Sequence, residues 1–463
     1  AISASSKVGS STMLRPLVAR HELLGRCCSG LYGSLRPACH HAIGSPCVGG
    51  RDVWVPLTRQ GLKNAPKLNA SPRRVAIVSS PRAEEVAVDA RPPQVLRDAA
   101  DPDALRKLCS EDVVDMAGVL IDTPSISGFE QAMARCLHSF LRGQGWEVVL
   151  QPVPPQRGLV DGEERFNVFA HRPGAPNPEL IFNTHMDTVP PYFPAKLDRA
   201  AGILRGRGAC DTKSLMAAQM LAAQALVAAG QTNVGLLFVV SEETDHTGMQ
   251  VANALNLAPR WMVVGEPTEK KVIRAQKGIL KVRVSCQGIA AHSGYPHLGH
   301  SATADLVHVL HELLREQWPS GPLGDTHLNI GTLTGGEAAN VVAPSASADL
   351  LFRLVDDPQS TIDRVSSICS GFGASVELIA VNPPVPMEYV SDAITGYDFD
   401  TVAFNTDIPY FDFCKGEGPP GKAVLYGHGS ITDAHTLREH IIVDDLRQLV
   451  SCYGELAGQL LRQ

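Results

Sequence analysis

Imidazole and carboxylate side chains follow several short apolar segments of this sequence. They are His185, Asp187, Asp211, Glu242, Glu243, Glu266 and, nearer the C-terminus, His435. Carboxylates at this density repel one another, so a cation is expected among them. Imidazole and carboxylate donors without a thiolate suit zinc or a similar divalent ion. Two imidazoles with several carboxylates can also hold two ions, with one Asp between them at ~3.5–4 Å.

Each motif has a plainer interpretation when it is taken alone. A His-x-Asp string can be a solvated loop, and Glu242-Glu243 can be a charged surface turn. The Gly206-x-Gly208 pair resembles a phosphate loop only weakly, and no Lys-Ser/Thr follows at the spacing that nucleotide binding requires. Cys210 is either a nucleophile or a residue packed beneath its loop. The metal interpretation gains weight because all these motifs fall at the ends of predicted strands.

Three apolar runs predict the strands that position these side chains. They are Leu180–Thr184, Val234–Val240 and Trp261–Val264, and helices are predicted over 103–121, 131–145 and 212–229, with a further strand over 146–153. Strands that are apolar throughout and alternate with helices indicate an α/β fold, a mostly parallel sheet with helices on both faces. Ligands of such sheets bind at the carboxyl ends of the strands, where the predicted metal residues lie.

The pattern changes near residue 278. Strands are predicted over 278–287, 328–333, 346–354 and 375–381, with helices over 302–317 and 361–370. This βαββαβ order is typical of a ferredoxin-like α+β unit. Pro383, Pro384 and Pro386 predict a linker, after which the segment from Thr401 rejoins the first domain. We therefore expect a catalytic domain over 91–277 and 389–463, interrupted by an inserted domain over 278–388.

Composition excludes several classes of protein. With 463 residues, 44% of them hydrophobic and 19% charged, the chain is long and apolar enough for two or three folded domains, not a disordered protein. No apolar run reaches about 18 residues, which argues against a polytopic membrane protein. The net charge of −7 gives no basic surface for nucleic acid. The eleven cysteines are scattered, without the spacing of a disulfide framework or zinc ribbon.

The N-terminal segment differs from the rest in charge. Residues 1–80 contain eleven Lys/Arg and two acids, which leaves 30 basic and 46 acidic residues in the remainder. An acid-poor, Arg- and Ser-rich N-terminus is typical of an organellar transit peptide, and a basic tail that stays attached is the alternative. We predict a transit peptide over 1–90, with the chloroplast preferred to the mitochondrion as destination.

The motifs together resemble one enzyme family. The strings are Asn183–Pro190, Gly206–Lys213, Glu242-Glu243, Gly265–Thr268, Ala291–Ser293, Gly335–Val342 and Ala434-His435. They resemble the dizinc acetylornithine deacetylase and succinyl-diaminopimelate desuccinylase family, whose relatives include aminoacylases and glutamate carboxypeptidases. The resemblance covers roughly residues 105–460. The usual Gly-Pro-Gly before the last His reads Gly427-His428-Gly429 here, which puts side-chain selectivity in question.

The resemblance implies a role for each site residue. Asp211 would lie between two Zn²⁺ ions, which Co²⁺ could replace, with His185 and Glu266 on one ion and Glu243 and His435 on the other. Asp187 would orient His185, and Glu242 would be the general base. The inserted domain would be a lid and the surface of a homodimer. From it His292 would stabilise the oxyanion across the dimer, while Asn340 and Arg353 would bind the substrate's amino-acid part.

These roles predict an amidohydrolase that removes the acyl group from an N-acyl amino acid. The leading substrate is N-acetyl-L-ornithine, which would yield L-ornithine and acetate for arginine biosynthesis. A broader aminoacylase, dipeptidase or carboxypeptidase is the alternative within the family. A catalytically silent metal-binding scaffold is the alternative from another class, and Glu242 argues against it, because a silent protein has no need of a base that binds no metal.

Overall fold

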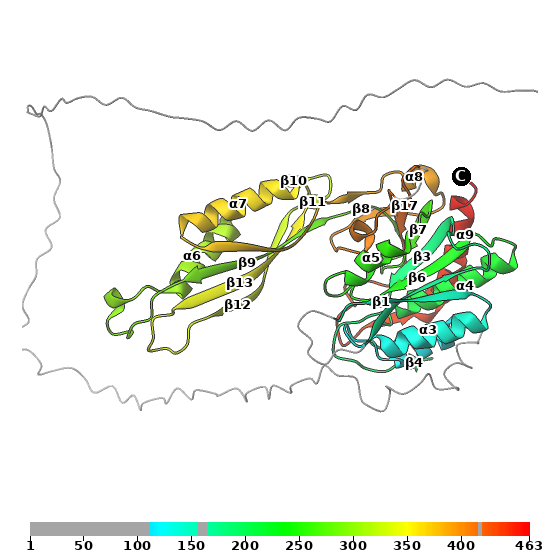
Figure 1. Ribbon diagram of the computed structural model, residues 1–463, viewed down its shortest axis with the longest axis horizontal. Helices are drawn as coiled ribbons and strands as arrows, with labels where there is room; N and C mark the ends of the chain where they lie inside the picture. Colours follow the sequence, from blue (N-terminus) through cyan, green and yellow to red (C-terminus); the bar gives the residue numbers. More distant parts are fainter. Residues whose placement is uncertain (1–111, 156–163, 415–418) are drawn as a thin grey trace, which may run out of the picture. The chain divides into compact units, whose positions relative to one another are not determined.

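The computed structural model describes residues 112–155, 164–414 and 419–463 (Figure 1). The chain divides into two units, Ala1–Ser80 and Pro81–Gln463, and all described residues belong to the second. The predicted transit peptide and the first part of the predicted helix 103–121 lie outside the described residues. The remainder of that helix is α2, Val113–Asp122, which begins where the Asp112 carboxylate accepts a hydrogen bond from the Val114 amide at 2.9 Å.

A nine-stranded sheet forms the centre of the first domain. Its order is β1-β2-β6-β3-β7-β17-β8-β15, with β16 also paired to β8. The strands are β1 Glu147–Val153, β2 Arg165–His171, β3 Leu180–His185, β6 Val234–Val239, β7 Trp261–Val264, β8 Val272–Gln276, β15 Val385–Pro386, β16 Phe399–Val402 and β17 Lys422–Leu425. The four inner strands β6, β3, β7 and β17 are mutually parallel, while β1, β2 and β15 pair antiparallel. The predicted α/β fold is confirmed.

Helices and the apolar strands build the core of this domain. The helices besides α2 are α3 Gln131–Gly143, α4 Lys213–Ala228, α5 Thr247–Ala252, α8 Val390–Ala393 and α9 Val443–Leu460. Helices α2, α4 and α9 pack against one another, α4 packs on β3 and β6, and α3 and α5 pack on β1 and β2. Every residue of β3, β6 and β7 is buried, so both faces of the inner sheet are covered.

The second part of the fold has its own sheet and its own core. Its elements are β9 Gly278–Gln287, α6 Ala302–Arg315, β12 His327–Gly335, β13 Ser345–Leu354, α7 Pro358–Gly371 and β14 Ser375–Asn382, and we call it the β9–β14 unit. The sheet is antiparallel throughout, in the order β12-β13-β9-β14. Residues of β9 and β13 alternate in burial, so one face packs on α6 and α7. The predicted βαββαβ order matches these elements.

Two small sheets contain the remaining described strands. The strands β10 Ser320–Gly321 and β11 Gly324–Asp325 form a hairpin, and β4 Lys196–Asp198, β5 Ile203–Arg205 and β18 His440–Ile442 form a three-stranded sheet. The described helices include none that is both long enough and apolar enough to cross a bilayer.

The chain returns to the central sheet earlier than predicted. Val385 and Pro386, expected to form a linker, pair with Gln276 and Ala275 at the sheet's edge, before the expected return at Thr401. Pro386 is tolerated there because an edge strand needs no N–H donor on its open side. The proline cluster therefore contains an edge strand, which the sequence pattern did not reveal.

Candidate metal centre

The parallel register aligns the ends of the inner strands. His185 ends β3 opposite Val239 of β6, and Asn183 of β3 lies opposite Val264 of β7. Glu266 therefore follows its strand at the level at which His185 ends β3, and Glu242 and Glu243 follow β6 directly. Because parallel strands end at the same edge of a sheet, residues about 80 positions apart in the sequence meet there.

Asp211 lies between the two imidazoles. Its Oδ1 is 2.9 Å from Nε2 of His185, and its Oδ2 is 3.2 Å from Nε2 of His435. The same His435 nitrogen is 2.9 Å from Oε2 of Glu243, and Nε2 of His185 is 3.7 Å from Oε1 of Glu266. The five predicted metal ligands thus lie together, in the pairing that the resemblance implies. The Asp211–Thr212 peptide bond is cis.

The donor set fits a divalent cation. Donor atoms of His185, Asp211 and Glu243 all lie within 4.8 Å of one another. Burial, reinforced by neighbouring carboxylates, raises the pKa of Glu266 well above its usual value and also raises that of Glu243. Hydrogen bonds to Asp211 and Glu243 raise the pKa of His435 to about 10. These shifts all reflect a need for positive charge among buried carboxylates, which a metal ion would meet.

Glu439 holds the loop that presents Asp211. Its buried Oε1 accepts hydrogen bonds from the amides of Gly208, Cys210 and Asp211 at 2.9–3.1 Å. Its Oε2 accepts from the buried guanidinium of Arg207 at 2.5 Å. Sequence reasoning missed Glu439, because its partners lie about 230 positions away and no local pattern marks them.

Asp187 has two tasks. The shorter contact of His185 Nδ1, 2.9 Å, is to the Asp187 backbone carbonyl, and the carboxylate lies 3.5 Å away. The carboxylate itself accepts hydrogen bonds from the Ser127 hydroxyl at 2.7 Å and from the amides of Glu242 and Glu243 at 3.1 and 3.3 Å. Asp187 therefore contacts His185 as predicted and also fixes the backbone of the two glutamates, a role that the sequence did not suggest.

A buried ion pair supports the turn that carries Glu242. Arg165 donates Nε and Nη2 to the two oxygens of Glu130 at 2.8 and 2.6 Å, and both side chains are fully buried. Nη2 of Arg165 also donates to the hydroxyl of Ser241. Ser241 has a left-handed φ of 67°, and its carbonyl accepts from the His246 amide at 2.7 Å. The pair thus anchors the tight turn from which Glu242 projects.

Replacing Glu130 by Ala should destabilise the protein strongly, because it leaves the Arg165 guanidinium buried without its anion. We expect the free energy of unfolding to fall by about 3–5 kcal/mol, as measured by urea denaturation. The matched control is Glu164→Ala, which removes an exposed acid with one long 3.5 Å hydrogen bond to Gln131. Equal unfolding midpoints for the two variants would contradict this account of the pair.

Glu242 directly precedes the predicted ligand Glu243, but its carboxylate forms no ion pair with His185 or His435 among the described residues. Its side chain is 12% exposed, and its Oε1 is 3.9 Å from Nδ1 of His246. His246 contacts Asp407 at 2.9 Å and stacks on Tyr410 at 4.1 Å between ring centroids. Burial, with the charges of Glu266, Asp407 and Glu243, raises the pKa of Glu242 well above its usual value. A carboxylate whose pKa is raised is a stronger base than an ordinary Glu.

The predicted site residues of the β9–β14 unit are His292, Asn340 and Arg353, and they lie in two separate parts of it. His292 and Asn340 lie on adjoining exposed loops, where the Ser293 amide donates to the Asn340 carbonyl and Nδ1 of His292 accepts from the Gly294 amide. Arg353, on β13, is half-buried; burial lowers the pKa of its guanidinium, and the charge of Glu242 opposes that shift. The roles of His292, Asn340 and Arg353 stay predictions.

Two other residues named by the sequence have structural tasks. His428, which replaces the expected proline, is buried, with Nε2 3.0 Å from the Tyr426 hydroxyl and Nδ1 2.7 Å from the Asp445 carbonyl. Both ring nitrogens of His428 therefore have partners within the protein and are not available to a substrate. Burial raises the pKa of the Cys210 thiol well above its usual value, which disfavours the nucleophilic thiolate.

Comparison with known proteins gives a consistent result. Residues 181–459 match the family model described as peptidase family M20/M25/M40. A probable carboxypeptidase of Paracoccidioides brasiliensis is 36% identical over 389 residues, which cover 77% of this chain and 87% of that protein.

Solved structures share the fold at low sequence identity. A tripeptidase of Staphylococcus aureus is 20% identical with a TM-score of 0.60, over 76% of this chain and 99% of that one. A dinuclear metal-binding peptidase of Bacillus subtilis from the M20 family is 14% identical with a TM-score of 0.55, over 79% of this chain and 100% of that one. At these identities the structural likeness extends to the fold alone.

Proposed function

Because the chain belongs to the peptidase family M20/M25/M40, we propose that it is a metal-dependent hydrolase of N-acyl amino acids and short peptides, cleaving the amide bond next to a free carboxylate. The observation that carries this proposal is the placement of Asp211 between His185 and His435. Arg353 supports it, because this half-buried guanidinium makes no ion pair with any described residue and can take a substrate carboxylate.

The chain's own residues would divide the work as follows. His185 and Glu266 would hold one metal ion, Glu243 and His435 a second, with Asp211 shared between them; we propose Zn²⁺ for both, with Co²⁺ able to replace it. Bound divalent ions lower the pKa of water and polarise a scissile carbonyl. Glu242 would take a proton from the attacking water and pass it to the leaving amine. The water oxygen joins the acyl carbon, the C–N bond breaks, and no proton is gained or lost overall.

Hydrolysis of N-acetyl-L-ornithine is the second candidate. It rests on the setting of Glu266 in the string Gly265–Thr268, which resembles the acetylornithine and desuccinylase branch. Action of His292 across a homodimer, substrate binding by Asn340 and organellar targeting by residues 1–90 stay predictions. The last of these lies outside the described residues.

Replacing Arg353 by Ala should raise KM by about 10–100-fold and change kcat less, because the guanidinium is expected to bind the substrate carboxylate in both ground and transition states. Steady-state kinetics on N-acetyl-L-leucine and on its carboxamide, which lacks the charge, will test this. The carboxamide should be a poor substrate of the native enzyme, and its KM should change little in the Arg353→Ala variant. An unchanged KM for the acid in Arg353→Ala would refute the proposed carboxylate site.

A further inference from the structure

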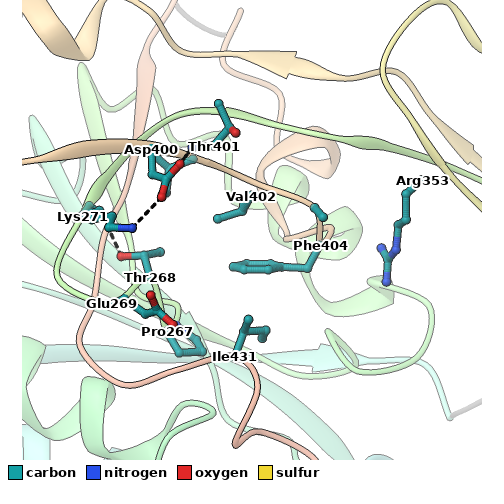
Figure 2. Close-up of a pocket in the computed structure, with 12 residues that line it drawn as sticks. Pro267, Thr268, Glu269, Lys271, Arg353, Asp400, Thr401, Val402, Phe404 and Ile431 are labelled. Carbon is teal, nitrogen blue, oxygen red and sulfur yellow. Dashed lines mark hydrogen bonds and ion pairs between the residues drawn. The ribbon is translucent and has the colours of Figure 1, made fainter. Parts of the chain in front are cut away.

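A cavity of about 390 Å³ lies beside the loops of the metal centre (Figure 2). Its lining comes from the segment after Glu266, from β16 and the residues that follow it, from Ile431 and from Arg353. The lining residues are Pro267, Thr268, Glu269, Lys271, Ile273, Arg353, Asp400, Thr401, Val402, Ala403, Phe404 and Ile431. Pro267 is the direct neighbour of Glu266, and Ile431 lies four residues before His435. The cavity therefore adjoins the site of hydrolysis.

The middle of the cavity is apolar. Figure 2 shows Val402, the Phe404 ring and Ile431 facing a common space, with Pro267 to the side of Ile431. Ile431 is 36% exposed, and Phe404 is only half-buried. Large apolar side chains that remain accessible beside a polar site mark a place where an apolar group of a ligand is covered.

Both carboxylates of the cavity accept hydrogen bonds. The Asp400 carboxylate accepts from Nζ of Lys271 at 2.6 Å and from the Thr401 amide at 2.8 Å. Glu269 accepts from the hydroxyl of Ser430 at 2.9 Å. Lys271 therefore neutralises Asp400, while Arg353 is left for the substrate carboxylate. A cationic side chain placed among Val402, Phe404 and Ile431 would lose its hydration, which is costly.

Arg353 sets the direction in which a substrate would enter. Figure 2 shows Arg353 and the Lys271–Asp400 pair on opposite sides of Phe404. An amino acid whose carboxylate lies on Arg353 would therefore direct its side chain past Phe404 and Ile431. A volume of about 390 Å³ is large enough for one large side chain.

We propose that this cavity binds the side chain of the amino acid released by hydrolysis, and that it selects apolar side chains such as those of leucine and phenylalanine over the cationic chain of ornithine. The inference rests on the proposed function, because it requires hydrolysis next to a carboxylate held by Arg353. It names the substrate class and favours the first candidate function over the second.

The test compares kcat/KM of the zinc-loaded enzyme for the N-acetyl derivatives of L-leucine, L-phenylalanine, L-ornithine and L-lysine. We expect the apolar pair to exceed the cationic pair by about 10–100-fold. Ile431→Asp places a carboxylate in the lining of the cavity and should reduce the ratio of apolar to cationic kcat/KM about 10-fold. The matched control is Leu437→Asp, which adds the same charge at a 76% exposed position outside the cavity and should leave the ratio unchanged.

A binding measurement gives a readout that does not need turnover. Calorimetry with the zinc-loaded Glu242→Gln variant should show tighter binding of N-acetyl-L-leucine than of N-acetyl-L-ornithine, and Phe404→Ala in that background should weaken the former about 10-fold. Hydrolysis with a preference for ornithine, or an equal response of both Asp variants, would overturn the selectivity while leaving the proposed function intact. Hydrolysis of none of the four substrates would overturn both.

Discussion

The variant Glu242→Gln should lose about 10²–10⁴-fold in kcat and keep its full metal content. The reason is that Glu242 lies beside the metal ligands and is expected to move protons without binding an ion. Gln preserves the size of the side chain and removes only the basic oxygen, so the turn anchored by Ser241 should stay folded. Metal analysis and steady-state kinetics on the same preparation will measure both quantities.

The pH dependence follows from the same carboxylate. Burial raises the pKa of Glu242 well above its usual value, and a general base works only when it is deprotonated. The rate should therefore rise with pH through the pKa of Glu242, and the raised pKa moves this rise to higher pH than an ordinary Glu would give. The residual activity of Glu242→Gln should lack that rise.

Two controls separate the base from its neighbours. Glu243→Gln should instead lose metal, because Glu243 contacts His435 at 2.9 Å within the ligand cluster. Mixing Glu242→Gln chains with His292→Ala chains should restore partial activity if His292 acts across a dimer, and no activity if it acts within one chain. Retention of more than a tenth of the native rate by Glu242→Gln, or loss of its metal, would contradict the assigned role.

The grouping of the predicted metal residues could be expected from the sequence because the signals are local. Three of the five ligands, His185, Glu243 and Glu266, lie at or just after the end of a buried strand, and the parallel arrangement of these strands places their carboxyl ends together. The prediction of β3, β6 and β7 was therefore enough to gather His185, Glu243 and Glu266, although they are spread over 82 positions.

The supporting residues could not be predicted because their partners are distant in the sequence. Glu439 binds amides about 230 positions away, and Arg165 joins Glu130 and Ser241 across 35 and 76 positions. Nothing near Arg165 distinguishes it from a surface arginine, and only the pairing of β2 between β1 and β6 places it in the core. The return strand β15 was missed for a related reason, since prolines usually indicate a linker.

Removal of the metal should abolish hydrolysis altogether and also destabilise the fold. The carboxylates of Asp211, Glu243 and Glu266 are buried together, so without a cation their mutual repulsion is relieved only by protonation. Dialysis against a chelator should therefore lower Tm, and Zn²⁺ or Co²⁺ should restore it, since a ligand that binds the native state stabilises it by mass action. The Tm of the variant Asp211→Asn should neither fall on chelation nor rise when metal is added, because the variant lacks the carboxylate shared by both imidazoles.

Release of L-leucine from N-acetyl-L-leucine, followed while Zn²⁺ is added back to the metal-free enzyme, tests the central claim most directly. We expect no detectable release from the metal-free enzyme, and a rate that rises with zinc and saturates near two ions per chain. The Asp211→Asn protein should stay inactive at every zinc concentration. Full activity of the metal-free enzyme, or recovery of Asp211→Asn with zinc, would contradict the assignment of this centre to hydrolysis.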